Sequence, residues 1–157
     1  MESLWTDIYS TFRAEFADVP DIKEATRILI RLSVAVVLGG LIGYERETSG
    51  KAAGLRTHML VSLGSALFVL VPLQAGVPLA DMSRVLQGLA SGIGFLGAGA
   101  IIKLNEEGSI KGLTTAASIW MVAAIGVAAG LGRDATAVIA TLFTLAILEI
   151  LQRWKRG

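Results

Sequence analysis

The sequence predicts an all-α membrane protein with about five transmembrane helices, and three observations lead to that prediction. The 157 residues are 54% hydrophobic and only 17% charged, with a mean hydropathy of +0.66, whereas soluble domains carry about 25% charged residues. The charges are also uneven, because residues 1–26 hold six acids and two bases while long tracts after them hold almost none. Those tracts are apolar segments near the ~20 residues that cross a bilayer core of ~30 Å.

Residues 1–26 form the first part of the prediction, an amphipathic N-terminal arm. Apolar and aromatic residues recur there at helical spacing with acids between them. We expect a helix over 4–19 that lies at the membrane interface, where Trp and Tyr are favoured, and that ends at Pro20. Packing of the same helix against the rest of the protein is the alternative. The apolar positions are Leu4, Trp5, Ile8, Tyr9, Phe12, Phe16 and Val19.

Residues 27–152 are predicted to form one transmembrane domain, followed by a short basic tail at 153–157. Because lipid cannot satisfy backbone N–H and C=O groups, each apolar segment must be a helix. The connections between the segments are short, so sequential helices are expected to pack antiparallel. The five segments are 28–44, 57–76, 85–102, 113–131 and 135–151.

The distribution of Lys and Arg predicts the orientation of these helices. An odd number of spans places the two termini on opposite sides of the membrane. One set of loops and the tail hold more bases than the other side, which favours a cytoplasmic C-terminus and an N-terminus outside. The eight bases of the richer side are Arg46, Lys51, Arg56, Lys103, Lys111, Arg153, Lys155 and Arg156.

Glycine is concentrated inside the apolar segments, where GxxxG spacings let helix backbones approach closely. The segment GIGFLGAGAI at 92–101 also has the GxGxxG spacing of a dinucleotide site, but no strand precedes it. We therefore expect helix packing, with 85–102 as the most crowded, central helix; a locally unwound helix that exposes backbone to a polar cavity is the alternative. The packing glycines are Gly39, Gly43, Gly88, Gly92, Gly94, Gly97, Gly99, Gly126 and Gly130.

Polar residues gather at the ends of the segments on the predicted cytoplasmic side. They are expected to form either an interfacial salt-bridge cluster or a mouth that binds a cation or a partner. The loop at 103–112 adds oxygen ligands of the kind that Mg²⁺ uses, although such a loop is also a normal solvated loop. The candidate residues are Glu45, Arg46, Glu47, Arg56, His58, Asn105, Glu106 and Glu107.

Three further polar residues lie within the predicted spans. Thr114 and Thr115 can hydrogen-bond across or back along their helix, and Glu149 is a carboxylate inside an apolar run, which makes it a functional candidate by default. The chain has no cysteine and a single histidine, so a thiolate metal site and a multi-histidine site are excluded within one chain. No nucleophile and base are arranged for catalysis, and a net charge of +1 suggests no nucleic-acid partner. We expect no enzyme.

Four stretches together resemble the MgtC/SapB family of bacterial inner-membrane proteins. They are GGLIGYERE (39–47), GLRTHMLVSLG (54–64), GIGFLGAGAI (92–101) and GLTTAASIWMVAAIGVAAGLG (112–132). The resemblance implies a helical domain in the inner membrane, often followed by a soluble cytoplasmic domain, and we expect this chain to be the membrane-only kind. It also implies a role in growth at low Mg²⁺, in bacterial virulence inside host cells, and in regulation of partners such as the membrane ATP synthase.

The predicted function is regulation of membrane partners in Mg²⁺ homeostasis and stress adaptation. We expect a homo-oligomer, with a dimer favoured, in the lipid bilayer. The rival prediction is a small transporter or channel for Mg²⁺ or another cation, with Glu45, Glu47, Asn105 and Glu107 at its mouth. A purely structural membrane module is a third possibility. Mg²⁺ is the only cofactor that the sequence suggests.

Overall fold

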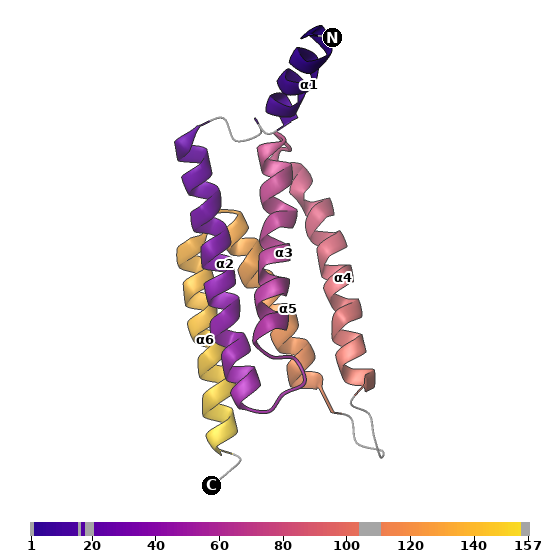
Figure 1. Cartoon of the computed structure of the whole chain (residues 1–157). Coiled ribbons are helices and arrows are strands. Elements are labelled where there is room, and N and C mark those ends of the chain that lie inside the picture. The colour runs from indigo at the N-terminus through magenta and orange to yellow at the C-terminus, as the bar shows by residue number, and fades with distance from the viewer. Residues whose placement is uncertain (1, 16, 18–20, 104–110, 155–157) are drawn as a thin grey trace. The chain divides into compact units, whose positions relative to one another are not determined.

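The described part of the chain, residues 2–15, 17, 21–103 and 111–154, consists of helices joined by short turns in the computed structural model (Figure 1). No strand occurs in these ranges, which confirms the all-α prediction. The elements are α1 (Glu2–Glu15), α2 (Ile22–Thr48), α3 (Leu55–Gln74), the short 3₁₀ helix η1 (Leu79–Asp81), α4 (Met82–Lys103), α5 (Leu113–Gly130) and α6 (Asp134–Trp154).

Four of these helical segments are long and apolar enough to cross a membrane, judged on the described residues: α2, α3, η1 with α4, and α5. The fifth expected span corresponds to α6, which is 21 residues long. The helices extend past the expected apolar runs where polar residues continue the helix. The clearest case is α2, whose 27 residues include the polar stretch that ends at Thr48.

The chain divides into two compact units, Met1–Ile30 and Arg31–Gly157. In the first unit, the large apolar side chains of α1 are exposed, from Leu4 to Phe12. The helix ends at Glu15, earlier than expected, and Phe16, Val19 and Pro20 lie outside the described residues. The start of α2 is capped, since the Glu24 N–H donates to Oδ1 of Asp21 at 2.7 Å.

In the second unit, α5 is the central helix. Half of its apolar window is buried, against 11% for the window that contains α4, and α5 contacts α3, α4 and α6. Figure 1 shows α5 behind α3, with α4 at one edge. The expectation that 85–102 is the most crowded, central helix is therefore wrong for a single chain. The largest core cluster contains Ala35, Leu38, Ile42, Ala66, Val122, Ile125, Ala129 and Ala137.

The glycine positions fall into two groups, and only one group forms close helix contacts within the chain. A Cβ on Gly39 would lie 2.7 Å from Cβ of Ser62, and a Cβ on Gly126 would lie 2.2 Å from the Ser62 carbonyl oxygen. Gly43 and Gly130 make similar contacts with α3. Glycine at these positions therefore brings α2 and α5 against the backbone of α3.

The glycines of α4 behave differently. Nothing lies within 4 Å of a Cβ added at Gly88, Gly92, Gly94 or Gly99, and at Gly97 the nearest atom is Cβ of Ala116 at an ordinary 3.5 Å. Among the α4 glycines, Gly97 therefore meets a neighbouring helix of the described chain, and helix packing by the others stays a prediction. A GxxxG spacing shows that a close contact is sterically allowed, but the spacing carries no information about which helix makes it.

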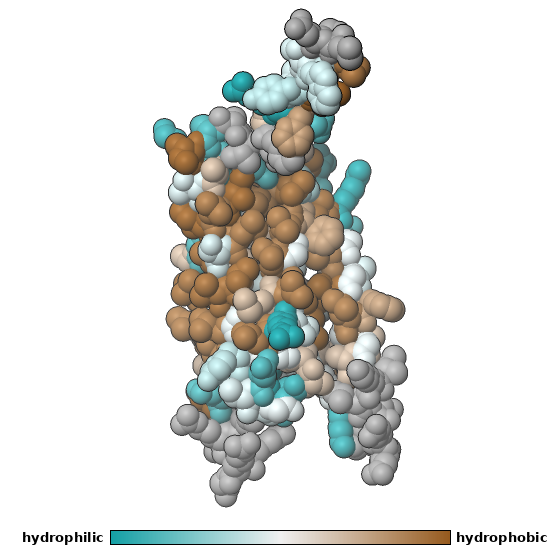
Figure 2. Space-filling model, in the orientation of Figure 1, coloured by the Kyte–Doolittle hydropathy of each residue, from teal (hydrophilic) through white to brown (hydrophobic). Residues whose placement is uncertain are grey.

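The ends of the second unit differ in polarity from its middle. Figure 2 shows an apolar band over the middle of the helices and paler, hydrophilic residues at the end where α2 passes into α3. At the opposite end of α5, Nη1 of Arg31 donates to the Gly130 carbonyl at 3.1 Å. This bond satisfies a carbonyl that the helix itself leaves without a partner.

Candidate functional site

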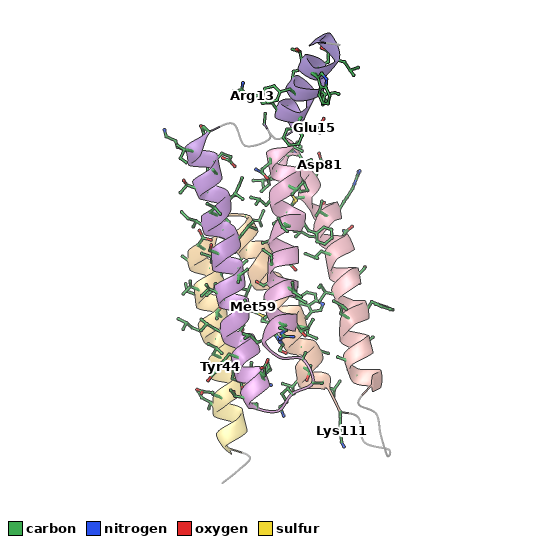
Figure 3. The ribbon with its side chains drawn as sticks, in the orientation of Figure 1. Arg13, Glu15, Tyr44, Met59, Asp81 and Lys111 are labelled. Carbon is green, nitrogen blue, oxygen red and sulfur yellow. The ribbon has the colours of Figure 1, made fainter. Side chains whose placement is uncertain are left out.

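A group of polar side chains lies where α2 passes into α3 and where α5 begins, and we call it the α2–α3 polar cluster. Its members are Glu45, Arg46, Glu47, Ser49, His58 and Ser118. In Figure 3, Tyr44 on α2 and Met59 on α3 mark this end of the helices, and Lys111 lies just before α5.

Glu45 and Arg46 form the charged part of the cluster. Nη2 of Arg46 donates to Oε1 of Glu45 at 2.5 Å, and Nε of Arg46 donates to Oε2. The Ser49 hydroxyl donates to Oε1 of Glu45 at 2.9 Å. Arg46 is only 2% exposed, and a buried charge is tolerated only when it is paired and hydrogen-bonded. Both carboxylate oxygens of Glu45 are therefore engaged within the protein.

Glu47 caps the following helix. Its Oε2 accepts a hydrogen bond from the backbone N–H of Leu55 at 2.8 Å. Leu55 is the first residue of α3, and the N-cap residue Gly54 supplies no side-chain cap. The first N–H groups of a helix need such an acceptor, and a carboxylate there also interacts favourably with the helix dipole. A Cβ on Gly54 would lie 2.5 Å from this oxygen, so glycine permits the close approach of the carboxylate.

His58 joins α3 to α5. Its side chain is fully buried, with Nδ1 2.9 Å from the Gly54 carbonyl oxygen and Nε2 3.0 Å from Oγ of Ser118. The Ser118 hydroxyl donates to the Thr115 carbonyl at 2.8 Å. The Gly54 oxygen can only accept, so Nδ1 carries a proton. The histidine therefore links the turn before α3 with the first turns of α5.

Of the other predicted residues, Thr115 meets this cluster through the carbonyl that accepts the Ser118 hydroxyl. Arg56 and Thr114 are exposed, and so is Glu149, which lies on α6. Thr115 is buried and contributes its carbonyl. Asn105, Glu106 and Glu107 lie outside the described residues.

The described residues of the cluster offer few free ligands for a metal ion. In the described ranges, no three His, Asp or Glu side chains are placed to hold one ion. A hard cation such as Mg²⁺ needs several free oxygen ligands, whereas Glu45 and Glu47 already accept hydrogen bonds from the protein. The cluster instead fixes how α2, α3 and α5 meet.

Sequence reasoning missed three serines. Ser49 completes the hydrogen bonding of Glu45, and Ser62 and Ser65 are buried in α3. The available signal was the spacing of His58, Ser62 and Ser65, which places them on one face of a helix.

These features define a polytopic helical membrane protein whose helix ends are held by a buried polar cluster. The chain belongs to the MgtC family, whose sequence model matches residues 32–156, so the expected family is confirmed. This membership and the apolar helices make it a bacterial membrane protein.

Three relatives illustrate the similarity. The chain is 43% identical to Protein SrpB of Synechococcus elongatus, over 80% of this chain and 75% of SrpB. It is 42% identical to the "Putative magnesium transporter YhiD" of Escherichia coli K12, over 78% of this chain and 59% of YhiD. It is 45% identical to Protein MgtC of Brucella abortus strain 2308, over 77% of this chain and 50% of MgtC. The chain thus spans about half to three quarters of these relatives. No solved structure matches it.

Proposed function

We propose that the chain regulates membrane partners in Mg²⁺ homeostasis and stress adaptation, and that it catalyses no reaction. The link to Mg²⁺ in this proposal rests on family membership and on the name of YhiD. The main support for regulation over transport is the hydrogen bonding of the α2–α3 polar cluster. Glu45 accepts hydrogen bonds from Arg46 and Ser49, and Glu47 accepts one from the Leu55 N–H. Such a cluster stabilises a fixed helix arrangement instead of offering ligands to a passing ion.

The exposed face of α4 supports binding to other membrane proteins. A Cβ added at Gly88, Gly92 or Gly99 would meet no atom of another described helix within 4 Å, and small residues are favoured where transmembrane helices of two chains meet. We propose that this face binds a second copy of the chain, with a dimer as the favoured form, and that a membrane complex such as the ATP synthase is a further partner. The N-terminus lies outside and the C-terminus in the cytoplasm in this proposal.

Ion flux separates regulation from transport. The protein is reconstituted in liposomes that contain a Mg²⁺-sensitive dye, with a known Mg²⁺ channel as the positive control. The proposal expects a trace equal to that of empty liposomes. Saturable uptake, abolished by Glu45→Gln, would establish the rival function of a cation transporter, which the name of YhiD favours.

Oligomer size tests the α4 contact. Gly92→Leu is expected to convert the dimer to a monomer in detergent without lowering its thermal stability, because the added side chain meets open space within the chain. The matched control is Gly64→Leu on α3, which also meets open space and is expected to remain dimeric. A dimer of wild-type size in Gly92→Leu excludes α4 as the contact.

Crosslinking in native membranes tests for a partner. The chain has no cysteine, so one introduced cysteine can be labelled without any background from other positions. A photoreactive label at Ser91→Cys on α4 is expected to give adducts with a second copy and with another membrane protein, whereas the label at Val37→Cys, exposed on α2, gives neither. Adducts with only a second copy at both positions would refute the adaptor function.

A further inference from the structure

Three polar residues occupy one face of α3 inside the bundle. Ser62 and Ser65 follow His58 by four and seven residues, a spacing that aligns side chains along one side of a helix. His58 and Ser62 are 0% exposed and Ser65 is 1% exposed. About two turns of an otherwise apolar membrane helix therefore carry a continuous polar face that contacts neither solvent nor lipid.

Neighbouring helices enclose this face. The close contacts of Gly39 and Gly126 with Ser62 bring the backbones of α2 and α5 to the middle of the row. Ser118 on α5 meets His58 at one end of the row through the 3.0 Å contact with Nε2. The polar row thus lies at the junction of α2, α3 and α5.

The two serine hydroxyls differ from other buried hydroxyls of the protein. On α6, Thr141 and Thr144 donate to the carbonyls of Ala137 and Ala140 at 2.9 and 2.7 Å, which is how hydroxyls in membrane helices are usually satisfied. Oγ of Ser62 and Oγ of Ser65 have no hydrogen-bond partner among the described residues.

The energetics favour a small polar ligand at these hydroxyls. A buried polar group without a hydrogen-bond partner is unfavourable, and the row holds two such hydroxyls. Immobilising one water molecule costs less entropy than two unpartnered hydroxyls cost in lost hydrogen bonds, and buried waters usually bridge several polar groups that lack other partners. One bridging water therefore removes more unfavourable free energy than its ordering adds.

We propose that Ser62 and Ser65 form an internal water site and that this water connects along α3 to His58. We call His58, Ser62, Ser65 and Ser118 the hydrated seam. The site needs neither Mg²⁺ nor a partner protein, so it does not depend on the proposed function.

The seam has a consequence for His58. Although its side chain has no exposed surface, water in the seam gives the ring a route for proton exchange. The charged groups that act electrostatically on the ring are Arg46 and Glu45 on α2, while the contact from α5 is the uncharged Ser118. Exchange therefore occurs beside an ion pair that is already neutralised.

Water-edited solid-state NMR of the protein in lipid bilayers tests the seam. His58 is the only histidine, so its ring signals need no sequential assignment. We expect magnetisation from water to reach the His58 ring and two serine Cβ signals at short mixing times. The two signals are identified by their loss in Ser62→Ala/Ser65→Ala. Absence of transfer from water to the His58 ring, whose signals are assigned without any variant, refutes the proposal even if no variant folds.

The matched variant pair tests the path. In Ser62→Ala/Ser65→Ala the water transfer to the His58 ring is expected to fall at least twofold. In the control Thr141→Ala/Thr144→Ala, which removes two buried hydroxyls that bond to their own helix, the transfer is expected to stay unchanged. Undiminished transfer in the serine variant shows that water does not reach His58 along α3. If the double variant does not fold, Ser65→Ala alone makes the same comparison.

Discussion

At the scale of single residues, Arg46 stands out because its charged guanidinium is buried and needs a partner of opposite charge. It is 2% exposed on a membrane helix and depends on Glu45 for its charge balance. A buried ion pair contributes little net stability when intact, but removal of one partner leaves a buried charge. Arg46 is therefore a residue that the fold must retain for as long as Glu45 is present.

Substitution of Arg46 tests this dependence. Arg46→Met is expected to lower the free energy of unfolding by about 3–5 kcal/mol, because Glu45 loses the partner of both carboxylate oxygens. The measurement is denaturant unfolding in detergent, followed by circular dichroism. Arg56→Met is the control, since Arg56 is exposed and its loss is expected to change stability by less than about 0.5 kcal/mol.

The double variant Glu45→Gln/Arg46→Met tests whether the unpaired carboxylate causes the loss. With Glu45 neutralised as well, much of the stability lost in Arg46→Met is expected to return. A single variant as stable as wild type would show that the pair is not the buried contact described here.

The sequence allowed part of the polar cluster to be predicted. The run Glu45-Arg46-Glu47 indicated a charged cluster, with a salt-bridge cluster as one of its two predicted forms. The cap that Glu47 gives to Leu55 joins residues eight apart through a turn, and the His58–Ser118 contact joins residues 60 apart. Local patterns carry no information on such pairs, because they depend on how the helices pack.

At the scale of the helices, the sequence predicted the elements well and their packing less well. All five apolar segments lie within or nearly within helices, since length and apolarity in lipid leave the backbone few alternatives. The central position of α5 was missed because both α4 and α5 are rich in small residues. In α5, a Cβ at Gly126 or Gly130 would meet the backbone of α3, whereas a Cβ at Gly88, Gly92, Gly94 or Gly99 of α4 would meet open space among the described residues.

Alanine substitution distinguishes these two groups of glycines. Gly126→Ala is expected to be strongly destabilising, because its Cβ would lie 2.2 Å from the Ser62 carbonyl oxygen, a backbone atom that cannot move aside. Gly88→Ala meets nothing within 4 Å and is expected to stabilise the monomer slightly, since alanine is the better helix former. Thermal unfolding in detergent compares the two. Equal melting temperatures would contradict the helix contact between α3 and α5.

At the scale of the whole molecule, the helix arrangement makes the orientation in the membrane testable. The 20 residues of α3 rise about 30 Å, the thickness of a bilayer core. Lys51 precedes this helix and Ala80 follows it, and both are exposed. The two residues therefore report opposite sides of the membrane.

Cysteine labelling reads the orientation directly. With a membrane-impermeant maleimide on intact spheroplasts, Ala80→Cys is expected to react and Lys51→Cys to be protected until the membrane is permeabilised. The reason is that Lys51 belongs to the base-rich set of loops, which the positive-inside rule places in the cytoplasm. The reverse pattern would invert the orientation and place the α2–α3 polar cluster at the outer face. In that case any partner of the cluster would have to lie outside the cytoplasm, which would exclude a cytoplasmic regulator acting there.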